Sequence, residues 1–463
     1  MNTPQQYDAI VIGAGQAGGP LSTALARAGM KTALIERKHV GGTCVNEGCT
    51  PTKTMIASGR VAYLARRGAD YGVHTGPISV DIVKVRQRKR DIVDSFRNGS
   101  QKRIEQTPGV ALIFGDAAFS GPRTVSVRVK DGRELVLSAQ YVFINAGTRA
   151  SRPRLDGIDQ VSTLDNVSIM ELDIVPDHLL VLGGGYIGLE FGQLFRRFGS
   201  RVTIVQSGSQ LLTREDPDVA EAVTQVLRQD GVDVLLSAKA NRVAQQDGKI
   251  TLEIQSQGSS TAIIGSQLLV ATGRVPNSDT LNLPAAGIET DEHGFIKVNE
   301  RLQTSADGVY ALGDIKGGPA FTHISYDDFR IIRANLLEKK SASTKNRQVP
   351  YVVFIDPQLG RIGLTESEAR SQGREIQVAR LPMSSVARAL ELDEPRGFMK
   401  VIVDASTEQI LGASVLGIEG GEIMSMLEIA IMARVPYTVL RDATLAHPTL
   451  AESLNNLFAS ISN

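Results

Sequence analysis

Short apolar runs, glycine-rich turns and helix-like segments follow one another at the start of the chain. Residues 9–12 are apolar, the turn 13–18 contains three glycines, 21–28 has helical character, and 31–35 is a second apolar run that ends at Glu36. Continuous apolar runs are typical of strands buried on both faces of a parallel sheet. The pattern predicts a strand–turn–helix–strand unit of the α/β class.

The same pattern recurs in the middle of the chain. Residues 179–182 form an apolar run, 183–188 a glycine turn, 189–198 a helix-like segment, and 201–205 a second run that is followed by Gln206. A single glycine turn is weak evidence, but two copies in this context predict two Rossmann-like dinucleotide-binding domains.

Domain boundaries follow from where each nucleotide unit closes. We predict a first nucleotide domain over 1–150, a second over 151–275, and a return to the first over 276–345. After Pro350 strand-like and helix-like runs alternate, which predicts an α+β domain over 346–463. The runs that support this last domain are 351–354, 397–403, 422–432 and 450–458.

Composition narrows the class of protein. The 463 residues include 50 basic and 50 acidic side chains, so the net charge is zero and nothing indicates a nucleic-acid or membrane partner. A basic cluster at 84–90 begins a long helix and is expected to be a solvated helix face. No targeting or spanning segment is visible, and with only two cysteines a secreted disulfide scaffold is excluded. We therefore expect a cytoplasmic enzyme.

Both cysteines lie close together, at Cys44 and Cys49, with Lys53 just beyond them. A zinc site would need four ligands, and His39 alone does not complete one, so we expect no metal site. A reactive pair needs a thiolate, which a nearby cation such as Lys53 favours. Two buried structural cysteines are the alternative reading.

Each glycine turn has a chemical use. Gly13 makes the first turn tight, Gly15 lets the backbone approach a pyrophosphate, Gly18 lets helix pack on strand, and Glu36 can accept from ribose hydroxyls. In the second copy Gln206 stands where a carboxylate would favour NAD. Because this side chain is uncharged, it would not repel the 2′-phosphate of NADP, so we expect NADPH slightly more than NADH and leave both open.

A histidine near the end of the chain is the candidate acid–base. His447 is followed by Pro448, which can open a helix, so that Glu452 is expected one turn inside it. A carboxylate beside the imidazole would orient the ring and suit it to proton transfer with a sulfur leaving group. Alone, such a His-Pro pair is more often a packing feature.

Taken together, these motifs resemble the class I flavoprotein disulfide reductases, which include dihydrolipoamide dehydrogenase, glutathione reductase and mercuric reductase. The resemblance covers essentially the whole chain. It implies that FAD is bound by Gly13, Gly15, Gly18, Glu36, Gly42, Thr43, Lys53, Gly147, Asp314 and His323. It implies that NADP or NAD is bound by Gly183, Gly185, Tyr186, Gly188, Gln206 and Gly273.

The resemblance also implies catalytic roles. Cys49 would be the flavin-proximal thiol and Cys44 the thiol that meets the acceptor, while Lys53 and Glu190 would form an ion pair beside the flavin. His447, held by Glu452, would act on the cysteines of the other subunit of a homodimer, and 346–463 would be the dimerisation domain. Electrons would pass from NAD(P)H through FAD to the redox disulfide and then to the acceptor.

Departures from each subfamily bear on the acceptor. Mercuric reductases carry a second cysteine pair that this chain lacks, and dihydrolipoamide dehydrogenases usually have a histidine where Leu445 stands. Residues 321–328 look closest to the mercuric-reductase-like and reactive-chlorine-resistance branch. We expect a small disulfide, a quinone or a metal ion as acceptor, in oxidative or metal stress defence. Dihydrolipoamide dehydrogenase, glutathione reductase and a non-catalytic flavin redox sensor are the alternatives.

Overall fold

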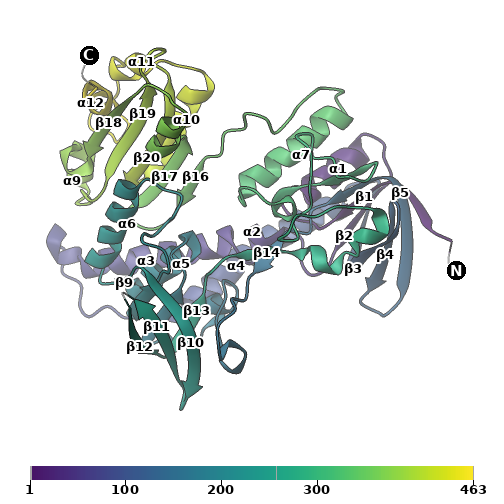
Figure 1. The fold of residues 1–463 in the computed structure, drawn as a ribbon, viewed down its shortest axis with the longest axis horizontal. Coiled ribbons are helices and arrows are strands. Elements are labelled where there is room, and N and C mark those ends of the chain that lie inside the picture. Colours follow the sequence, from purple (N-terminus) through teal and green to yellow (C-terminus); the bar gives the residue numbers. More distant parts are fainter. Residues whose placement is uncertain (1–2, 257, 462–463) are drawn as a thin grey trace. The chain divides into compact units, whose positions relative to one another are not determined.

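The computed structural model describes residues 3–256 and 258–461 and divides into two compact units (Figure 1). The first unit combines Met1–Thr54, Lys84–Ser151 and Gly273–Arg347, and the second combines Met55–Val83, Arg152–Thr272 and Gln348–Asn463. Segments far apart in the sequence therefore build each unit.

A six-stranded sheet forms the centre of the first unit. Its order is β1-β2-β3-β4-β5-β15, with a further pairing between β1 and β5. The strands are β1 (Gln5–Ile12), β2 (Thr32–Glu36), β3 (Val110–Gly121), β4 (Thr124–Val129), β5 (Glu134–Ile144) and β15 (Val309–Ala311). The pairs β1–β2, β2–β3, β1–β5 and β5–β15 are parallel, whereas β4 pairs antiparallel with β3 and β5. A short antiparallel pair, β6 (Thr148–Ala150) with β14 (Arg274–Pro276), lies beyond β5.

Both faces of this sheet are buried, which explains the continuous apolar run in β1. Ala9 and Val11 belong to one core cluster, together with Leu21 of a neighbouring helix, whereas Ile10 and Ile12 belong to another. Alternate residues of a strand point to opposite faces. The helices that begin in or belong to this unit are α1 (Gly18–Arg27), α2 (Gly42–Asn46), α3 (Cys49–Arg66), α4 (Ile82–Glu105) and α7 (Thr322–Leu336).

The second unit contains three sheets. A parallel sheet has the order β13-β7-β8-β9, formed by β7 (His178–Leu182), β8 (Arg201–Val205), β9 (Asp233–Leu235) and β13 (Gln267–Val270). An antiparallel sheet is formed by β10 (Ala238–Gln246), β11 (Lys249–Ser256) and β12 (Ser259–Gly265). The C-terminal antiparallel sheet has the order β16-β17-β20-β19-β18, with bounds Tyr351–Val353, Gln358–Gly363, Ile410–Gly417, Phe398–Asp404 and Ile376–Pro382 in that order.

Helices pack on these sheets. They are α5 (Tyr186–Phe198), α6 (Pro217–Gln229), α8 (Glu366–Ser371), α9 (Ala387–Glu391), α10 (Gly420–Met432), α11 (Tyr437–Arg441) and α12 (Ser453–Ala459). Short 3-10 helices connect other elements, at Gly68–Tyr71, Ile158–Gln160, Ser168–Glu171, Asn277–Thr280, Leu283–Ala286, Gly313–Lys316 and Met383–Ser385. In Figure 1 the C-terminal sheet carries α10 beside β20, and residues of both share one core cluster.

The predicted α/β fold with a C-terminal α+β part is confirmed, although several predicted ends were wrong. The first helix begins at Gly18 rather than at residue 21, because Pro20 is tolerated in the first turn of a helix. The last helix begins at Ser453 rather than at residue 450. Among the residues described, none of the helices has both the length and the apolar character that crossing a membrane requires.

Candidate functional site

The first glycine turn lies directly after β1. Gly13 has a φ of +100°, and a Cβ built on it would lie 2.3 Å from the carbonyl oxygen of Asn145, so only glycine fits. The backbone N–H of Ala14 donates to Glu36 Oε2 at 2.9 Å, and the N–H of Lys38 donates to Glu36 Oε1 at 2.8 Å. The end of β2 is thus hydrogen-bonded to the turn.

A second glycine segment meets this turn. A Cβ on Gly42 would lie 2.7 Å from the Cα of Gly15, and a Cβ on Gly18 would lie 2.0 Å from the carbonyl oxygen of Gly13. Helix α1 begins at Gly18, directly after this turn, and the N-terminus of a helix favours a phosphate group. A tight glycine turn, a helix N-terminus and a strand-end carboxylate fit the adenosine and pyrophosphate parts of FAD.

The two cysteines lie at the junction of two helices, because Cys44 belongs to α2 and Cys49 begins α3. Both are thiols, Cys44 half-buried and Cys49 exposed. Cys49 Sγ lies 3.4 Å from Oγ1 of Thr322, the first residue of α7. The pair is therefore in contact with a hydroxyl group at a helix N-terminus, where a negative charge is favoured.

The Cys44 thiol is held protonated by its neighbours. Its hydrogen bond with Cys49 raises the pKa of Cys44, and so do burial and the negative charge that Cys49 can carry, whereas the Thr322 hydroxyl and the Lys53 ammonium lower that pKa. Because the charge of one thiol affects the pKa of the other, the apparent pKa values belong to the pair and not to either cysteine.

A buried carboxylate, Asp314, follows β15. Burial raises the pKa of Asp314, although Arg274 and a hydrogen bond from Thr148 act against it; the Thr148 Oγ1 to Asp314 Oδ2 distance is 3.4 Å. The turn before Asp314 is fixed by Asp328, which is fully buried and accepts from the N–H of Gly313 at 2.8 Å.

The remaining residues predicted to bind FAD lie in the same unit. Thr43 is in α2, Lys53 in α3, and Gly147 precedes β6 with a φ of +68°. His323, the second residue of α7, stacks on Phe321 with 5.4 Å between ring centroids. The first unit therefore contains all ten residues predicted to bind FAD.

The second glycine turn repeats the geometry of the first. A Cβ on Gly183 would lie 2.4 Å from the carbonyl oxygen of Ala271, and a Cβ on Gly188 would lie 2.3 Å from that of Gly183. The N–H of Gly184 donates to Gln206 Oε1 at 3.1 Å, as Ala14 does to Glu36. The strand-end residue thus has the same position in both copies but carries no charge in the second.

Other predicted residues of the second unit lie close to this turn in sequence. Gly185 is the N-cap of α5 and Tyr186 its first residue. Glu190 is 4% exposed, and its Oε1 accepts from the backbone N–H of Phe354 at 2.9 Å. Gly273, predicted with this group, belongs to the first unit.

His447 and Glu452 are in contact. The Glu452 carboxylate lies 2.8 Å from His447 Nδ1, which leaves Nε2 as the other ring nitrogen. Glu452 is the N-cap of α12 rather than a residue one turn inside a helix, which corrects the prediction. The reason is local: Thr449 accepts from the N–H of Glu452 at 3.2 Å and closes a turn before the helix starts.

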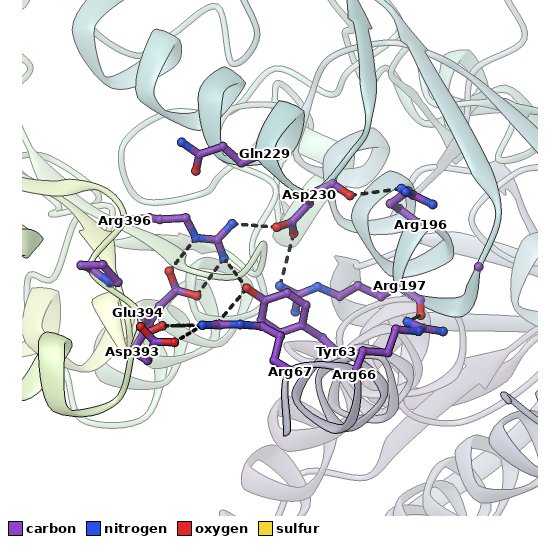
Figure 2. Close-up of a pocket in the computed structure, with 12 residues that line it drawn as sticks. Tyr63, Arg66, Arg67, Arg196, Arg197, Gln229, Asp230, Asp393, Glu394 and Arg396 are labelled. Carbon is purple, nitrogen blue, oxygen red and sulfur yellow. Dashed lines mark hydrogen bonds and ion pairs between the residues drawn. The ribbon is translucent and has the colours of Figure 1, made fainter. Parts of the chain in front are cut away.

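A cavity of about 580 Å³ in the second unit is lined by arginine (Figure 2). Its lining residues are Tyr63, Arg66, Arg67, Arg196, Arg197, Gly199, Gln229, Asp230, Asp393, Glu394, Pro395 and Arg396. Arg66 donates to the carbonyl oxygen of Arg197 near the end of α5, and Arg196 Nε donates to that of Asp230, the C-cap of α6, at 3.1 Å. Cations favour helix C-termini.

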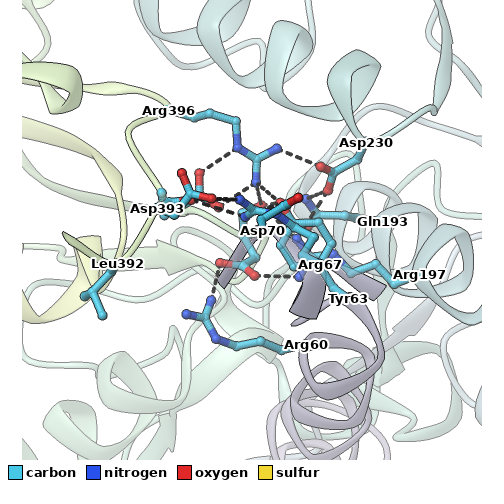
Figure 3. Close-up of polar contacts among 12 residues, drawn as sticks. Arg60, Tyr63, Arg67, Asp70, Gln193, Arg197, Asp230, Leu392, Asp393 and Arg396 are labelled. Atoms are coloured by element: carbon cyan, nitrogen blue, oxygen red, sulfur yellow. Dashed lines mark hydrogen bonds and ion pairs between the residues drawn. The ribbon is translucent and has the colours of Figure 1, made fainter. Parts of the chain in front are cut away.

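The other arginines of this cavity belong to an ion-pair network (Figure 3). Arg197 pairs with Asp356 at 2.6 Å and Asp230 at 3.3 Å, and Arg396 pairs with Asp230 at 2.6 Å. The Arg197 guanidinium also lies 4.1 Å from the centre of the Tyr63 ring. The cluster therefore serves to hold helices together, and we assign no ligand to it.

Two contacts at the cysteines were not predicted from the sequence. Thr322 lies beside His323, which the sequence did single out, but a threonine at the start of a helix does not by itself indicate a contact with a distant cysteine. Asn46, between the cysteines, makes three side-chain hydrogen bonds, one of them with Arg97. The sequence shows an amide side chain between the two cysteines, but it does not show that Arg97 is its hydrogen-bond partner.

Comparison with known proteins identifies relatives along the whole chain. The model of the pyridine nucleotide-disulphide oxidoreductases matches residues 7–328, and that of their dimerisation domain matches 349–458. The chain is 38% identical to a probable pyridine nucleotide-disulfide oxidoreductase, RclA, of Escherichia coli, over 98% of this chain and 99% of that protein. It is 35% identical to a mercuric reductase of Bacillus cereus, over 97% of this chain and 70% of that protein.

Solved structures give the same result. The Cu(II) complex of RclA from Escherichia coli, described as an HOCl-induced flavoprotein disulfide reductase, matches with a TM-score of 0.90 over 98% of this chain and 99% of that one, at 38% identity. The family resemblance is thus confirmed, and the cofactors implied by it are those of the family. This chain belongs to the pyridine nucleotide-disulphide oxidoreductases and is an FAD-dependent enzyme that uses NAD(P)H.

Proposed function

We propose that the chain is an NAD(P)H-dependent reductase whose Cys44–Cys49 dithiol passes electrons to Cu(II). The observation that carries the proposal is the contact of the two thiols with each other and with Thr322 in one unit. Thiolates are ligands of copper. The Cu(II) complex of the 38% identical relative supports this acceptor over a quinone or a disulfide.

The proposed cofactor sites are those predicted from the sequence. The turn at Gly13, Glu36 and Asp314 would hold FAD, and the turn at Gly183 with Gln206 would hold the nicotinamide cofactor. When bound, FAD accepts a hydride equivalent from NAD(P)H and supplies two electrons to the disulfide. Because Gln206 adds no negative charge to repel a 2′-phosphate, we propose NADPH as the preferred donor.

The reaction with copper balances over one dithiol. Cys44 and Cys49 each lose a proton and together lose two electrons as the S–S bond forms, and two Cu(II) ions become two Cu(I). Cleavage of that S–S bond then consumes two electrons and two protons, which come from NAD(P)H and solvent. Two half-reactions of this kind predict ping-pong kinetics.

Proton transfer is assigned to His447. Because Glu452 lies at Nδ1, the ring is oriented with Nε2 available to hold the proton that a reacting thiol releases. The match of 349–458 to a dimerisation domain supports a homodimer in which this histidine serves the cysteines of the other subunit. The ion pair of Lys53 with Glu190, the domain boundaries and a cytoplasmic location stay predictions.

An acceptor screen tests the proposal. NADPH and NADH oxidation would be measured anaerobically with Cu(II), oxidised glutathione, lipoamide, a quinone and Hg(II), with Cu(I) recorded by a chelator. We expect multiple turnovers with Cu(II), and loss of at least nine-tenths of this rate, roughly tenfold, in Cys44→Ser. A reaction without protein corrects for direct reduction of copper by the nucleotide.

Two results would contradict the proposal. Fast turnover with lipoamide and NADH, with slow copper reduction, would make the chain a dihydrolipoamide dehydrogenase. Turnover with none of the acceptors would favour the flavin redox sensor.

A further inference from the structure

The segment between the two cysteines is tied to α4 through one amide side chain. Asn46 Nδ2 donates to the carbonyl oxygens of Val40 at 3.0 Å and Gly42 at 2.9 Å, on the stretch that leads to Cys44. Its Oδ1 accepts from Arg97 Nε of α4 at 2.7 Å. Both amide hydrogens and the amide oxygen of Asn46 are therefore engaged.

The contact with Arg97 determines which way the amide faces. If the amide were reversed, its NH₂ group would meet the N–H of Arg97, and its oxygen would meet the carbonyl oxygens of Val40 and Gly42. The reversed amide would thus lose all three hydrogen bonds. A donor at Nε of Arg97 consequently fixes the orientation in which Asn46 holds the turn before Cys44.

Arg97 is itself held in place. Its Nη1 pairs with Asp94 Oδ1, one turn earlier on α4, at 3.1 Å, and the Arg97 side chain is only 24% exposed. Helix α4 also contacts α3, the helix that begins at Cys49, because Arg88 Nη1 donates to the carbonyl oxygen of Thr54 at 2.9 Å. The basic residues of α4 therefore do more than form a solvated helix face.

We propose that Arg97 is a positioning residue for the redox pair, which acts through Asn46 to hold Cys44 where it can bond to Cys49. This inference rests on the proposed function of the two thiols. An S–S bond restrains the segment by itself, whereas in the dithiol the hydrogen bonds of Asn46 contribute a larger part of that restraint. Loss of the Arg97 contact therefore frees the dithiol more than the disulfide, and the effective concentration of one thiol at the other falls.

The expected effect is a less stable disulfide. In Arg97→Met, which keeps most of the aliphatic stem, the equilibrium constant for disulfide formation should fall by about threefold to tenfold, the net size of one typical intramolecular hydrogen bond. A tenfold fall corresponds to a midpoint potential about 30 mV higher for this two-electron couple.

The experiment measures that constant directly in the FAD-loaded protein. Samples would be equilibrated in dithiothreitol redox buffers, trapped with a thiol-alkylating reagent and counted by mass. Arg103→Met is the matched control, because Arg103 is an exposed arginine of the same helix. Asn46→Ala and the double variant Asn46→Ala with Arg97→Met test whether Arg97 acts through Asn46. Once Asn46 is absent, we expect Arg97→Met to cause no further change in the equilibrium constant for disulfide formation. Thermal unfolding of each variant reports whether the fold is kept.

Three results would overturn the inference. The equilibrium constant for disulfide formation in Arg97→Met could stay within twofold of the parent value. Arg103→Met could change this constant as much as Arg97→Met does. The effects of Arg97→Met and Asn46→Ala on it could also be additive in the double variant. In each case the parent would still form its disulfide, and the proposed function would stand. A parent with no reversible Cys44–Cys49 disulfide would refute both.

Discussion

Replacing Thr322 with valine removes the hydroxyl group next to the redox pair and keeps the shape of the side chain. The Cys49 sulfur lies 3.4 Å from that hydroxyl, and the same hydroxyl lowers the pKa of Cys44. A hydrogen bond to a charged group contributes roughly 1.5–3 kcal/mol when well formed. For a long contact to an exposed sulfur we take about 1 kcal/mol, which corresponds to about 0.7 pKa unit.

The sign follows from which form the hydroxyl stabilises. It donates to the thiolate, so its loss disfavours the charged form and raises the first apparent pKa of the dithiol. Below that pKa the thiolate fraction should fall about fivefold, the equivalent of about 0.7 pKa unit. The assay is the rate of iodoacetamide alkylation of the reduced protein as a function of pH, with Thr322→Ser as the control that keeps the hydroxyl.

Either of two results would contradict a role of the Thr322 hydroxyl in stabilising the thiolate. Thr322→Val could give the parental alkylation profile, or Thr322→Ser could shift it as much as valine does. The first result would mean that the hydroxyl does not stabilise the thiolate, and the second that packing rather than the hydroxyl matters.

The remaining predictions concern stability and proton transfer. Burial acts to raise the pKa of Asp216, but hydrogen bonds from α8 and Lys400 hold that pKa at about 2, below the ordinary 3.8. The ionised carboxylate therefore stabilises the fold above about pH 4, and this contribution is lost as the pH falls through 2. Asp216→Asn should lower the free energy of unfolding by about 2 kcal/mol at pH 7, with a difference that shrinks toward pH 2 in denaturant titrations. Glu452→Gln should slow acceptor turnover by about tenfold while the same amount of dithiol forms with NADPH, as stopped-flow and thiol counts would record. Arg197→Met removes one of the cationic partners of the buried carboxylates Asp230 and Asp356, which keep Arg396 and Arg60, and should cost about 2 kcal/mol. The exposed Arg201→Met should cost less than about 1 kcal/mol, and both values would be read from denaturant midpoints.

Local sequence determines much of the candidate site. The glycine turns and the strand-end residues Glu36 and Gln206 could be predicted, because each depends on backbone conformation within one strand–turn–helix unit. The nearness of Cys44 to Cys49 follows from their spacing.

Contacts between distant segments could not be predicted. Thr322 is 273 residues from Cys49, and Arg97 is 51 residues from Asn46. Such pairs depend on how α4 and α7 pack, and a single sequence gives no measure of that packing. The position of Glu452 was wrong for a smaller reason, a threonine turn that delays the start of α12.

A thiol count after reduction by the nucleotide tests directly whether Cys44 and Cys49 carry the electrons to the acceptor. One sample of the oxidised, FAD-loaded protein would be mixed anaerobically with one equivalent of NADPH per chain, alkylated and analysed by mass. A second sample would receive the same NADPH and then Cu(II) before alkylation. Both cysteines should be alkylated in the sample with NADPH alone and neither in the sample with Cu(II), where two Cu(I) should form per chain. If Cu(I) forms while Cys44 and Cys49 stay alkylatable, or forms equally in Cys44→Ser, the dithiol is not the route to the acceptor.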